Sequence, residues 1–202
     1  MTDDQSIAAA KKLARKAAGD VRKAAHAHLR HSAAQALVDH GLDFAGELAG
    51  KTVSGFIPYL SEIDTRPLLR ALGARGCPTC VPVVIENNRP LEFRVWSPGD
   101  LTVPGRWGIP VPPEGSQVVD PDVLLVPMLA YDITGYRLGY GGGFYDRTLE
   151  KLRALKPVTA IGVAYSAQLV DTVVRGDHDQ PLDWMLTEKG AFRPGPDPED
   201  IA

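Results

Sequence analysis

The strongest constraint on the fold comes from two short apolar segments in the second half of the chain. Val123–Met128 and Val158–Tyr165 are apolar along almost their whole length, as is typical of strands buried on both faces of a parallel sheet. Between them, Phe144–Leu155 has the length and pattern of a helix. A buried strand, a helix and a second buried strand in this order predict a βαβ unit, whose two strands lie parallel.

The same alternation extends over the rest of the chain. We expect further strands at Thr52–Ile57, Cys80–Ile85, Leu91–Trp96 and Trp184–Thr187, and further helices at Pro67–Leu72 and Ala167–Val173. Asp64 or Thr65 is placed to cap the first of these helices, while Pro104–Pro121 is rich in Pro and Gly and indicates a long loop. The alternation favours an α/β fold with a mostly parallel sheet covered by helices, in which ligands bind at the carboxyl ends of the strands.

The chain begins with a long helical pattern, from about Gln5 to His40. The apolar residues at helical spacing, with a bend expected at Gly19, are Leu13, Ala17, Val21, Ala24 and Leu29. The basic residues fall on the positions left for solvent: Lys11, Lys12, Arg15, Lys16, Arg22, Lys23 and Arg30. Such a run usually marks a solvated helix face. Alternatively, Lys11 and Arg15, one turn apart, reach a phosphate.

The size and charge of the chain exclude several classes of protein. The 202 residues suffice for a single domain over residues 1–202, with a loose tail from about residue 194 to residue 202. A net charge of −3 does not suit a general nucleic-acid binder, which presents a basic face. No stretch has the length and apolarity of a membrane span, and the start lacks the apolar region of a signal peptide. We therefore expect a cytoplasmic monomer without nucleic-acid or membrane partners.

Cys77 and Cys80 form a C-x-x-C pair with three interpretations. A zinc site needs a second pair of ligands at suitable spacing, and a thioredoxin-like redox pair opens a helix after a strand. Here no second pair is evident, and the two cysteines lead into an expected strand. We therefore favour two structural or incidental thiols.

A glycine-rich loop follows the first buried strand. Four of the five residues from Gly139 to Gly143 are glycines, so the backbone can approach a ligand closely and direct several N–H groups at one point. The helix that follows at once presents an N-terminus that favours an anion. Arg137 and Arg147 flank the run, and Asp146 is placed to hold Mg²⁺. The loop matches neither the P-loop nor the dinucleotide-binding motif, and a flexible surface loop is the alternative to a phosphate site.

The glycine loop and several other segments resemble the 5-formyltetrahydrofolate cyclo-ligase family. The loop reads Arg-Leu-Gly-Tyr-Gly-Gly-Gly-Phe-Tyr-Asp-Arg over residues 137–147, which is similar to the family's signature. Segments similar to other family motifs occur in the same order, at residues 11–15, 58–65, 93–96, 105–110, 126–132, 168 and 178–183. Together these segments span about residues 10–188.

This resemblance implies an activity, its cofactors and a fold. The activity would be the ATP- and Mg²⁺-dependent conversion of 5-formyltetrahydrofolate to 5,10-methenyltetrahydrofolate, with release of ADP and phosphate. The formyl oxygen would be phosphorylated, and N10 would then close the ring. The fold would be a three-layer α/β/α architecture with a mostly parallel sheet, resembling that of ribose-5-phosphate isomerase and the CoA transferases, in agreement with the alternation above.

The resemblance also implies roles for individual residues. Arg137 and Tyr140 would be catalytic, and Asp146 and Asp179 would bind Mg²⁺. Folate contacts are implied for Tyr59, Glu62, Trp107, Gly139, Tyr140, Gly141, Gly142 and Gly143. ATP contacts are implied for Lys11, Lys12, Leu13, Ala14, Arg15, Arg137, Leu138, Gly139, Tyr140, Gly141, Gly142, Gly143, Phe144 and Tyr145. The alternatives are a turn role for Asp179, a solvated position for Glu62 and core packing for the aromatic residues.

Two further readings keep parts of the same pattern. A relative of the family that uses ATP on another small metabolite would retain the glycine loop, whereas a non-catalytic nucleotide- or RNA-binding descendant would use the basic helix. The chain also departs from the family at Val111, where a Glu is usual, and Glu114 is a candidate to supply the missing polar contact.

Overall fold

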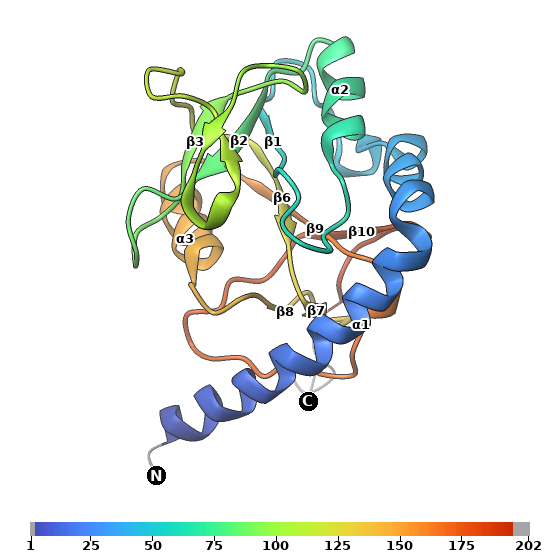
Figure 1. Ribbon diagram of the computed structural model, residues 1–202, viewed down its shortest axis with the longest axis vertical. Helices are drawn as coiled ribbons and strands as arrows, with labels where there is room; N and C mark the ends of the chain where they lie inside the picture. Colours follow the sequence, from blue (N-terminus) through green and yellow to red (C-terminus); the bar gives the residue numbers. More distant parts are fainter. Residues whose placement is uncertain (1–2, 196–202) are drawn as a thin grey trace.

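The computed structural model describes residues 3–195, and within them the core is a seven-stranded sheet of order β11-β10-β9-β6-β1-β2-β3 (Figure 1). The sheet strands are β1 (Val53–Ser54), β2 (Thr79–Val83), β3 (Glu92–Val95), β6 (Val123–Pro127), β9 (Thr159–Val163), β10 (Trp184–Thr187) and β11 (Gly190–Phe192). The helices are α1 (Asp3–His40), α2 (Arg66–Ala74) and α3 (Phe144–Leu155), with single 3₁₀ turns at Asp43–Ala45, Arg106–Gly108 and Ser166–Gln168. Only the edge strands β3 and β11 pair antiparallel, so the expected α/β class with a mostly parallel sheet is confirmed.

Alternating side chains of the central strands pack against helices on both faces of the sheet. Val123 and Leu125 of β6 belong to the cluster that contains side chains of α1 and α2. Leu124 and Val126 belong to the opposite cluster, together with Leu149 of α3. Because successive side chains of a strand point to opposite faces, a strand between two layers is apolar throughout. The uninterrupted apolar run of β6 therefore reflects a three-layer arrangement, with α1 and α2 on one face and α3 on the other.

The strand order reverses between β1 and β6, which are neighbours at the centre of the sheet. From β1 the chain proceeds outwards to β2 and β3, and from β6 it proceeds outwards in the other direction to β9, β10 and β11. In open parallel sheets such a switch point leaves a crevice at the carboxyl ends of the two strands, and ligands bind there. The loops that follow β1 and β6 are therefore the segments that this topology brings together.

Helix α1 is continuous through Gly19, and its buried face differs from the prediction. The residues expected on the apolar face are largely exposed: Leu13, Ala17, Val21 and Ala24. Leu37 in the second half is fully buried against the sheet, whereas Leu13 in the first half is 75% exposed. The second half of α1 covers the sheet, whereas the first half borders a cavity and therefore needs no continuous apolar stripe. The prediction that every basic residue of this helix faces solvent is wrong for Arg22, which is 2% exposed.

Short elements account for the other differences from the sequence-based prediction. The helix expected at Ala167–Val173 is reduced to the 3₁₀ turn Ser166–Gln168, because Val170 and Val173 donate backbone hydrogen bonds to Tyr131 and Asp132 instead. Two hairpins were not anticipated: β4 (Val103–Pro104) with β5 (Pro110–Val111), and β7 (Ala130–Tyr131) with β8 (Arg137–Leu138). The edge strand β11 was also missed. Pairings of two or three residues are too short to produce a recognisable sequence period.

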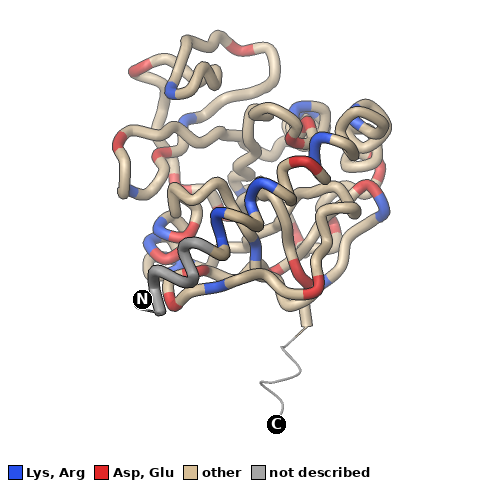
Figure 2. The backbone as a smooth tube through the Cα atoms, turned by 60° about the horizontal axis from the view of Figure 1, so that its bottom comes forward, with Lys and Arg blue, Asp and Glu red and all other residues tan. Residues whose placement is uncertain are grey.

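The described residues also bear on the excluded classes. None of their helices is long and apolar enough to cross a membrane. Basic and acidic positions are both spread over the molecule (Figure 2), and their numbers nearly balance, with 22 Lys and Arg against 25 Asp and Glu. Cys77 and Cys80 are buried free thiols, and burial raises the pKa of the Cys80 thiol to about 12. A thiol with a raised pKa is a poor nucleophile, so this environment favours a packing role for Cys80. The expected tail lies largely outside the described residues.

Candidate active site

A cavity of about 1020 Å³ opens at the switch point. Its wall is formed by the first half of α1, the β1–α2 connection, the β4–β5 hairpin, the glycine loop with the start of α3, and the segment before β10. Most residues with an expected ligand contact lie on this wall: Lys11, Arg15, Tyr59, Glu62, Trp107, Arg137, Leu138, Gly139, Tyr140, Gly141, Gly142, Gly143, Phe144, Tyr145, Asp146 and Asp179. The structure therefore brings together residues that are up to 168 positions apart in the sequence.

Three expected ATP contacts are not on the cavity wall. Lys12 and Leu13 are exposed, and Ala14 packs against Ala130 and Leu138 on the side of α1 that faces the β7–β8 hairpin. Positions three, four or seven apart share a face of a helix, so Lys11 and Arg15 reach the cavity while the residues between them do not. Any contact of these three residues with ATP stays a prediction.

The backbone of the glycine loop is shaped for close approach. Gly141 has φ +98° and Gly143, which precedes the first residue of α3, has φ +61°, both in the left-handed region that favours glycine. A Cβ atom at Gly141 would lie 3.0 Å from the guanidinium carbon of Arg15, whose Nε donates a hydrogen bond to the Gly139 carbonyl at 3.0 Å. The loop thus wraps an arginine of α1 and leads directly into a helix N-terminus, an arrangement that favours an anionic ligand.

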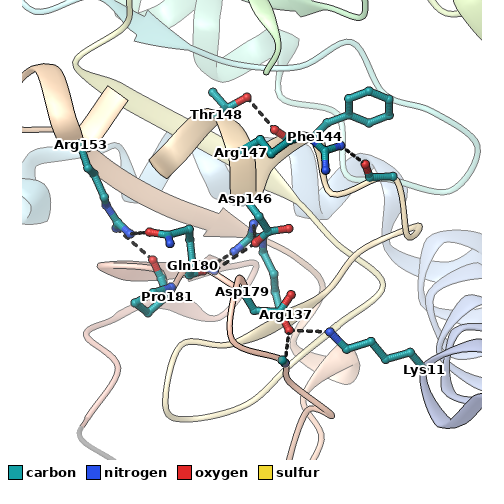
Figure 3. A network of polar contacts seen from close by, with 12 residues as sticks. Lys11, Arg137, Phe144, Asp146, Arg147, Thr148, Arg153, Asp179, Gln180 and Pro181 are labelled. Carbon is teal, nitrogen blue, oxygen red and sulfur yellow. Dashed lines mark hydrogen bonds and ion pairs between the residues drawn. The ribbon is translucent and has the colours of Figure 1, made fainter. Parts of the chain in front are cut away.

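Cations and carboxylates of the cavity wall are paired with one another (Figure 3). Lys11 Nζ lies 2.5 Å from Asp179 Oδ2, and Arg137 Nη2 lies 2.6 Å from Asp146 Oδ1. Arg137 Nη1 also donates a hydrogen bond to the Gln180 carbonyl at 2.5 Å, which ties β8 to the segment before β10. The side chain of Arg137 is 4% exposed and that of Asp146 is 24% exposed. Phosphate groups and a divalent cation are ligands that could exchange partners with these pairs.

The residues of the wall are compatible with Mg²⁺ bound together with a phosphorylated ligand. Asp146 and Asp179 supply hard oxygen ligands, and Mg²⁺ is usually held by one or two carboxylates plus phosphate oxygens and water. In the part of the chain that the structure describes, no group of three or more His, Cys, Asp or Glu residues forms a metal cage. Two carboxylates could therefore bind Mg²⁺ whose other ligands are phosphate oxygens and water.

Glu62 is a buried carboxyl group on the cavity wall, so the alternative of a solvated position does not hold. It is 5% exposed, and its Oε2 accepts a hydrogen bond from the Tyr59 backbone N–H at 2.8 Å. Burial raises the pKa of Glu62 to about 7, while the hydrogen bond from Tyr59, the charge of Arg22 and the hydroxyl of Tyr140 counteract that rise in pKa. A carboxyl group with a raised pKa in a cavity is typical of a functional site.

Arg22 is the residue of this region that sequence reasoning missed. Its Nη1 lies 3.6 Å from Glu62 Oε1, and its guanidinium lies 5.2 Å from the centre of the Tyr140 ring. Arg22 stands seven residues, or two helical turns, after Arg15, so both lie on one face of α1. Lys16 and Lys23 have the same spacing and are exposed, so this spacing alone does not distinguish the buried arginine.

Aromatic side chains complete the cavity wall. The rings of Tyr59 and Tyr140 lie 5.8 Å apart, and those of Trp107 and Phe144 lie 6.0 Å apart, each pair in an edge-to-face arrangement. Trp107 has φ +55°, a left-handed conformation that is rare and strained for a bulky residue, and it is 58% exposed. The alternative of core packing therefore does not hold for Trp107, which stands at the cavity mouth.

The fold and the cavity define an α/β protein with a large cavity at the switch point of a mostly parallel sheet, where proteins of this class bind ligands. The sequence model of the 5-formyltetrahydrofolate cyclo-ligase family matches residues 7–188, and the chain belongs to this family. It is 34% identical over 151 residues to the 5-formyltetrahydrofolate cyclo-ligase of Mycolicibacterium smegmatis, covering 71% of this chain and 76% of the relative. It is 36% identical over 141 residues to that of Escherichia coli K12, covering 67% and 77%.

Solved structures support the same assignment of the fold. The 5,10-methenyltetrahydrofolate synthetase of Aquifex aeolicus superposes with a TM-score of 0.74 at 28% identity, covering 91% of this chain and 92% of that one. The synthetase of Mycoplasma pneumoniae superposes with a TM-score of 0.68 at 21% identity, over 88% and 98% of the two chains. The second similarity concerns the fold alone.

Proposed function

We propose that this chain converts 5-formyltetrahydrofolate to 5,10-methenyltetrahydrofolate and hydrolyses ATP to ADP and phosphate in the process. Membership of the family supports this reaction and implies the use of ATP. The observation that carries the proposal is that one cavity is lined both by the glycine loop, whose backbone is suited to an anion, and by the buried carboxyl group of Glu62. A reaction between a triphosphate and a folate needs those two kinds of contact within one volume.

The chemistry requires activation of a poor electrophile. The formyl group on N5 is amide-like, so its oxygen is a poor leaving group until it carries a phosphoryl group. The formyl oxygen attacks the γ-phosphorus, and the bond to ADP breaks. N10 then attacks the activated carbon and loses its proton, and phosphate departs with the original formyl oxygen as the ring closes. No covalent bond to the protein is needed, so catalysis consists of positioning the two substrates and stabilising charge.

The wall residues divide between the two substrates in this proposal. Arg137, Lys11 and Arg15 would bind the triphosphate at the glycine loop, and Arg137 would stabilise charge on the transferred phosphoryl group. Tyr140, which belongs to the glycine loop and interacts with Glu62, would lie between the two substrates. Glu62 would bind the pterin, and Tyr59 and Trp107 would pack against its ring.

Asp146 and Asp179 would hold Mg²⁺, which when bound supplies positive charge to the phosphates. This arrangement supports a sequential exchange of partners. Lys11 and Arg137, which pair with Asp179 and Asp146, would bind phosphate groups once these carboxylates hold the metal. Each ligand would therefore bind weakly without the other. We also propose that the protein acts as a single-domain cytoplasmic monomer without nucleic-acid or membrane partners, and size-exclusion chromatography of the purified chain would test the monomer.

The decisive assay follows methenyltetrahydrofolate by its near-ultraviolet absorbance in a mixture of purified protein, 5-formyltetrahydrofolate, ATP and Mg²⁺. We expect product formation that stops when ATP or Mg²⁺ is omitted, with one ADP per product. A folded protein that binds ATP but forms no methenyltetrahydrofolate would contradict the proposed reaction. A non-hydrolysable ATP analogue provides the matched control, because it occupies the phosphate site without allowing phosphoryl transfer.

One observation favours a second candidate, the use of ATP on another small metabolite. Val111, which stands where the family usually has Glu, is buried in the cavity wall, while Glu114 lies on the same wall. The folate side of the cavity therefore differs in chemistry from the family pattern, whereas the phosphate side keeps it. Replacing Val111 with Glu should improve the KM for 5-formyltetrahydrofolate if the second candidate is correct.

A further inference from the structure

Arg22 is a buried cation that lies behind the cavity wall. Its Nε donates to Ser61 Oγ at 3.1 Å, its Nη1 donates to the Met128 carbonyl at 3.3 Å, and its Nη2 donates to the Tyr140 hydroxyl at 2.5 Å. The same Nη1 lies 3.6 Å from Glu62 Oε1. A guanidinium presents its five donors in a rigid plane, so these contacts fix several groups relative to one another.

The partners of Arg22 come from both sides of the switch point. Ser61 and Glu62 follow β1, Met128 follows β6, and Tyr140 belongs to the glycine loop. Glu62 and Tyr140 line the cavity, whereas Arg22 does not. Burying a charged guanidinium is unfavourable unless it is paired and hydrogen-bonded, and these contacts supply Arg22 with both kinds of partner.

We propose that Arg22 is a positioning residue that holds the carboxylate of Glu62 and the ring of Tyr140 in one arrangement. In this way it would fix the position of Glu62, which would bind the folate, relative to the glycine loop, which would bind the phosphates. This inference rests on the proposed function, because it concerns the geometry between the two substrates. Arg22 touches neither substrate and acts through the two residues that line the cavity.

The electrostatic surroundings of Glu62 give the proposal a measurable signature. The groups that face Glu62 are Arg22 and His26 from α1, Tyr140 from the glycine loop and Tyr145 from α3. Burial lowers the pKa of His26 and raises those of Tyr140 and Tyr145, so these three groups are neutral at neutral pH. Arg22 is thus the cation that keeps the pKa of Glu62 from rising further. Without Arg22, Glu62 would hold its proton to higher pH.

The test compares Arg22→Met with Lys23→Met, which removes the same charge from the next, exposed residue of α1. The measurements are kcat and the KM values for 5-formyltetrahydrofolate and ATP, over about pH 6 to about pH 9 so that the pKa of Glu62 is bracketed. We expect Arg22→Met to raise the folate KM about tenfold or more at neutral pH, a loss of about one decade in affinity. The rise should shrink at high pH, where Glu62 ionises, and the ATP KM should change less. Lys23→Met should match the wild type.

Arg22→Lys separates charge from geometry and serves if Arg22→Met does not fold. It keeps a cation near Glu62 but cannot reproduce the planar set of contacts to Ser61, Met128 and Tyr140. We expect the pH at which folate binding weakens to stay near that of the wild type, while the folate KM rises. A wild-type folate KM and pH profile in either variant would overturn the proposal. A lower melting temperature alone, without either kinetic change, would assign Arg22 a merely structural role and would also overturn it.

A second readout needs no turnover. In protein carrying ¹³C-labelled Glu carboxyl groups, the Glu62 signal should titrate at higher pH in Arg22→Met than in the wild type and in Lys23→Met. If the wild-type protein forms no methenyltetrahydrofolate, the proposed function fails while this titration still reports on Arg22. If the wild type is active but the Glu62 titration and the folate KM are unchanged in Arg22→Met, only the role of Arg22 is refuted.

Discussion

Replacing Glu62 with Gln should make the protein more stable at alkaline pH while it weakens folate binding. Glu62 is 5% exposed, and its pKa in the folded protein is about 7 compared with an ordinary value of 4.5. The fold therefore prefers the protonated carboxyl group. The stability that Glu62 contributes is fully present below about pH 4.5 and is lost as the pH rises through about 7.

The magnitude follows from the difference between the two pKa values. At 1.36 kcal/mol per pKa unit, ionising Glu62 in the folded state lowers the unfolding free energy by about 3 kcal/mol above pH 7. Gln has the shape of the protonated Glu and does not titrate. The Glu62→Gln variant should therefore match the wild type near pH 4.5 and gain up to about 3 kcal/mol over it at about pH 8. Domains are marginally stable, so such a gain would be a large fraction of the total.

Urea unfolding of the two proteins across this pH range measures the difference, and Glu150→Gln, an exposed residue of α3, is the control that should show no such trend. A constant difference between wild type and Glu62→Gln at all pH values would mean that Glu62 keeps an ordinary pKa. A variant less stable than the wild type at alkaline pH would refute the reasoning outright. An accompanying rise in the KM for 5-formyltetrahydrofolate would show that the buried carboxylate of Glu62 lowers the unfolding free energy but improves folate binding.

Other substitutions test the phosphate side of the cavity. Arg137→Met should lower kcat about a hundredfold or more, as expected for the loss of a cation that stabilises transition-state charge. The control is Arg153→Met, which should leave kcat unchanged because Arg153 also bonds to Gln180 but lies off the cavity wall. Asp146→Asn should raise the Mg²⁺ concentration needed for half-maximal activity about tenfold in a metal titration, and an unchanged requirement would remove it from the metal site. Gly141→Ala should weaken ATP binding, measured by calorimetry, because its φ of +98° strains a residue with a Cβ. Gly73→Ala, in α2 and off the cavity wall, meets open space and should bind ATP normally.

Much of the architecture could be predicted because its signals are local. Phe144–Leu155 and Trp184–Thr187 coincide with the observed helix and strand, and the apolar run at Val123–Met128 indicated a strand between two layers. The β7–β8 hairpin could not be predicted, because its strands are two residues long and their pairing depends on Asp132 accepting backbone hydrogen bonds from Thr134 and Tyr136. The extent of the single domain stays a prediction.

The residues of the site also divide into those that the sequence predicts and those that it does not. The glycine loop could be read directly, because its residues are consecutive, and Glu62 and Asp179 were identified by resemblance to the family. The burial of Arg22 could not be predicted from composition, since a basic residue on a helix is usually solvated. Its burial depends on Tyr140, a residue 118 positions away, whose hydroxyl accepts its hydrogen bond. Contacts of this range follow from the strand order and are not encoded in any local pattern.

The division of α1 into two halves determines how ligand binding would appear in amide hydrogen exchange. The second half packs on the sheet through Ala33 and Leu37, so its amides should exchange mainly by global unfolding. From residue 10 to residue 21, every side chain is exposed or only partly buried, so the amides of the first half should exchange by fraying, at a far lower free energy. A ligand that holds Lys11 and Arg15 would slow exchange in the first half and leave the second half almost unchanged. The amides of the second half of α1 thus provide an internal reference against which ligand-dependent exchange in the first half can be measured.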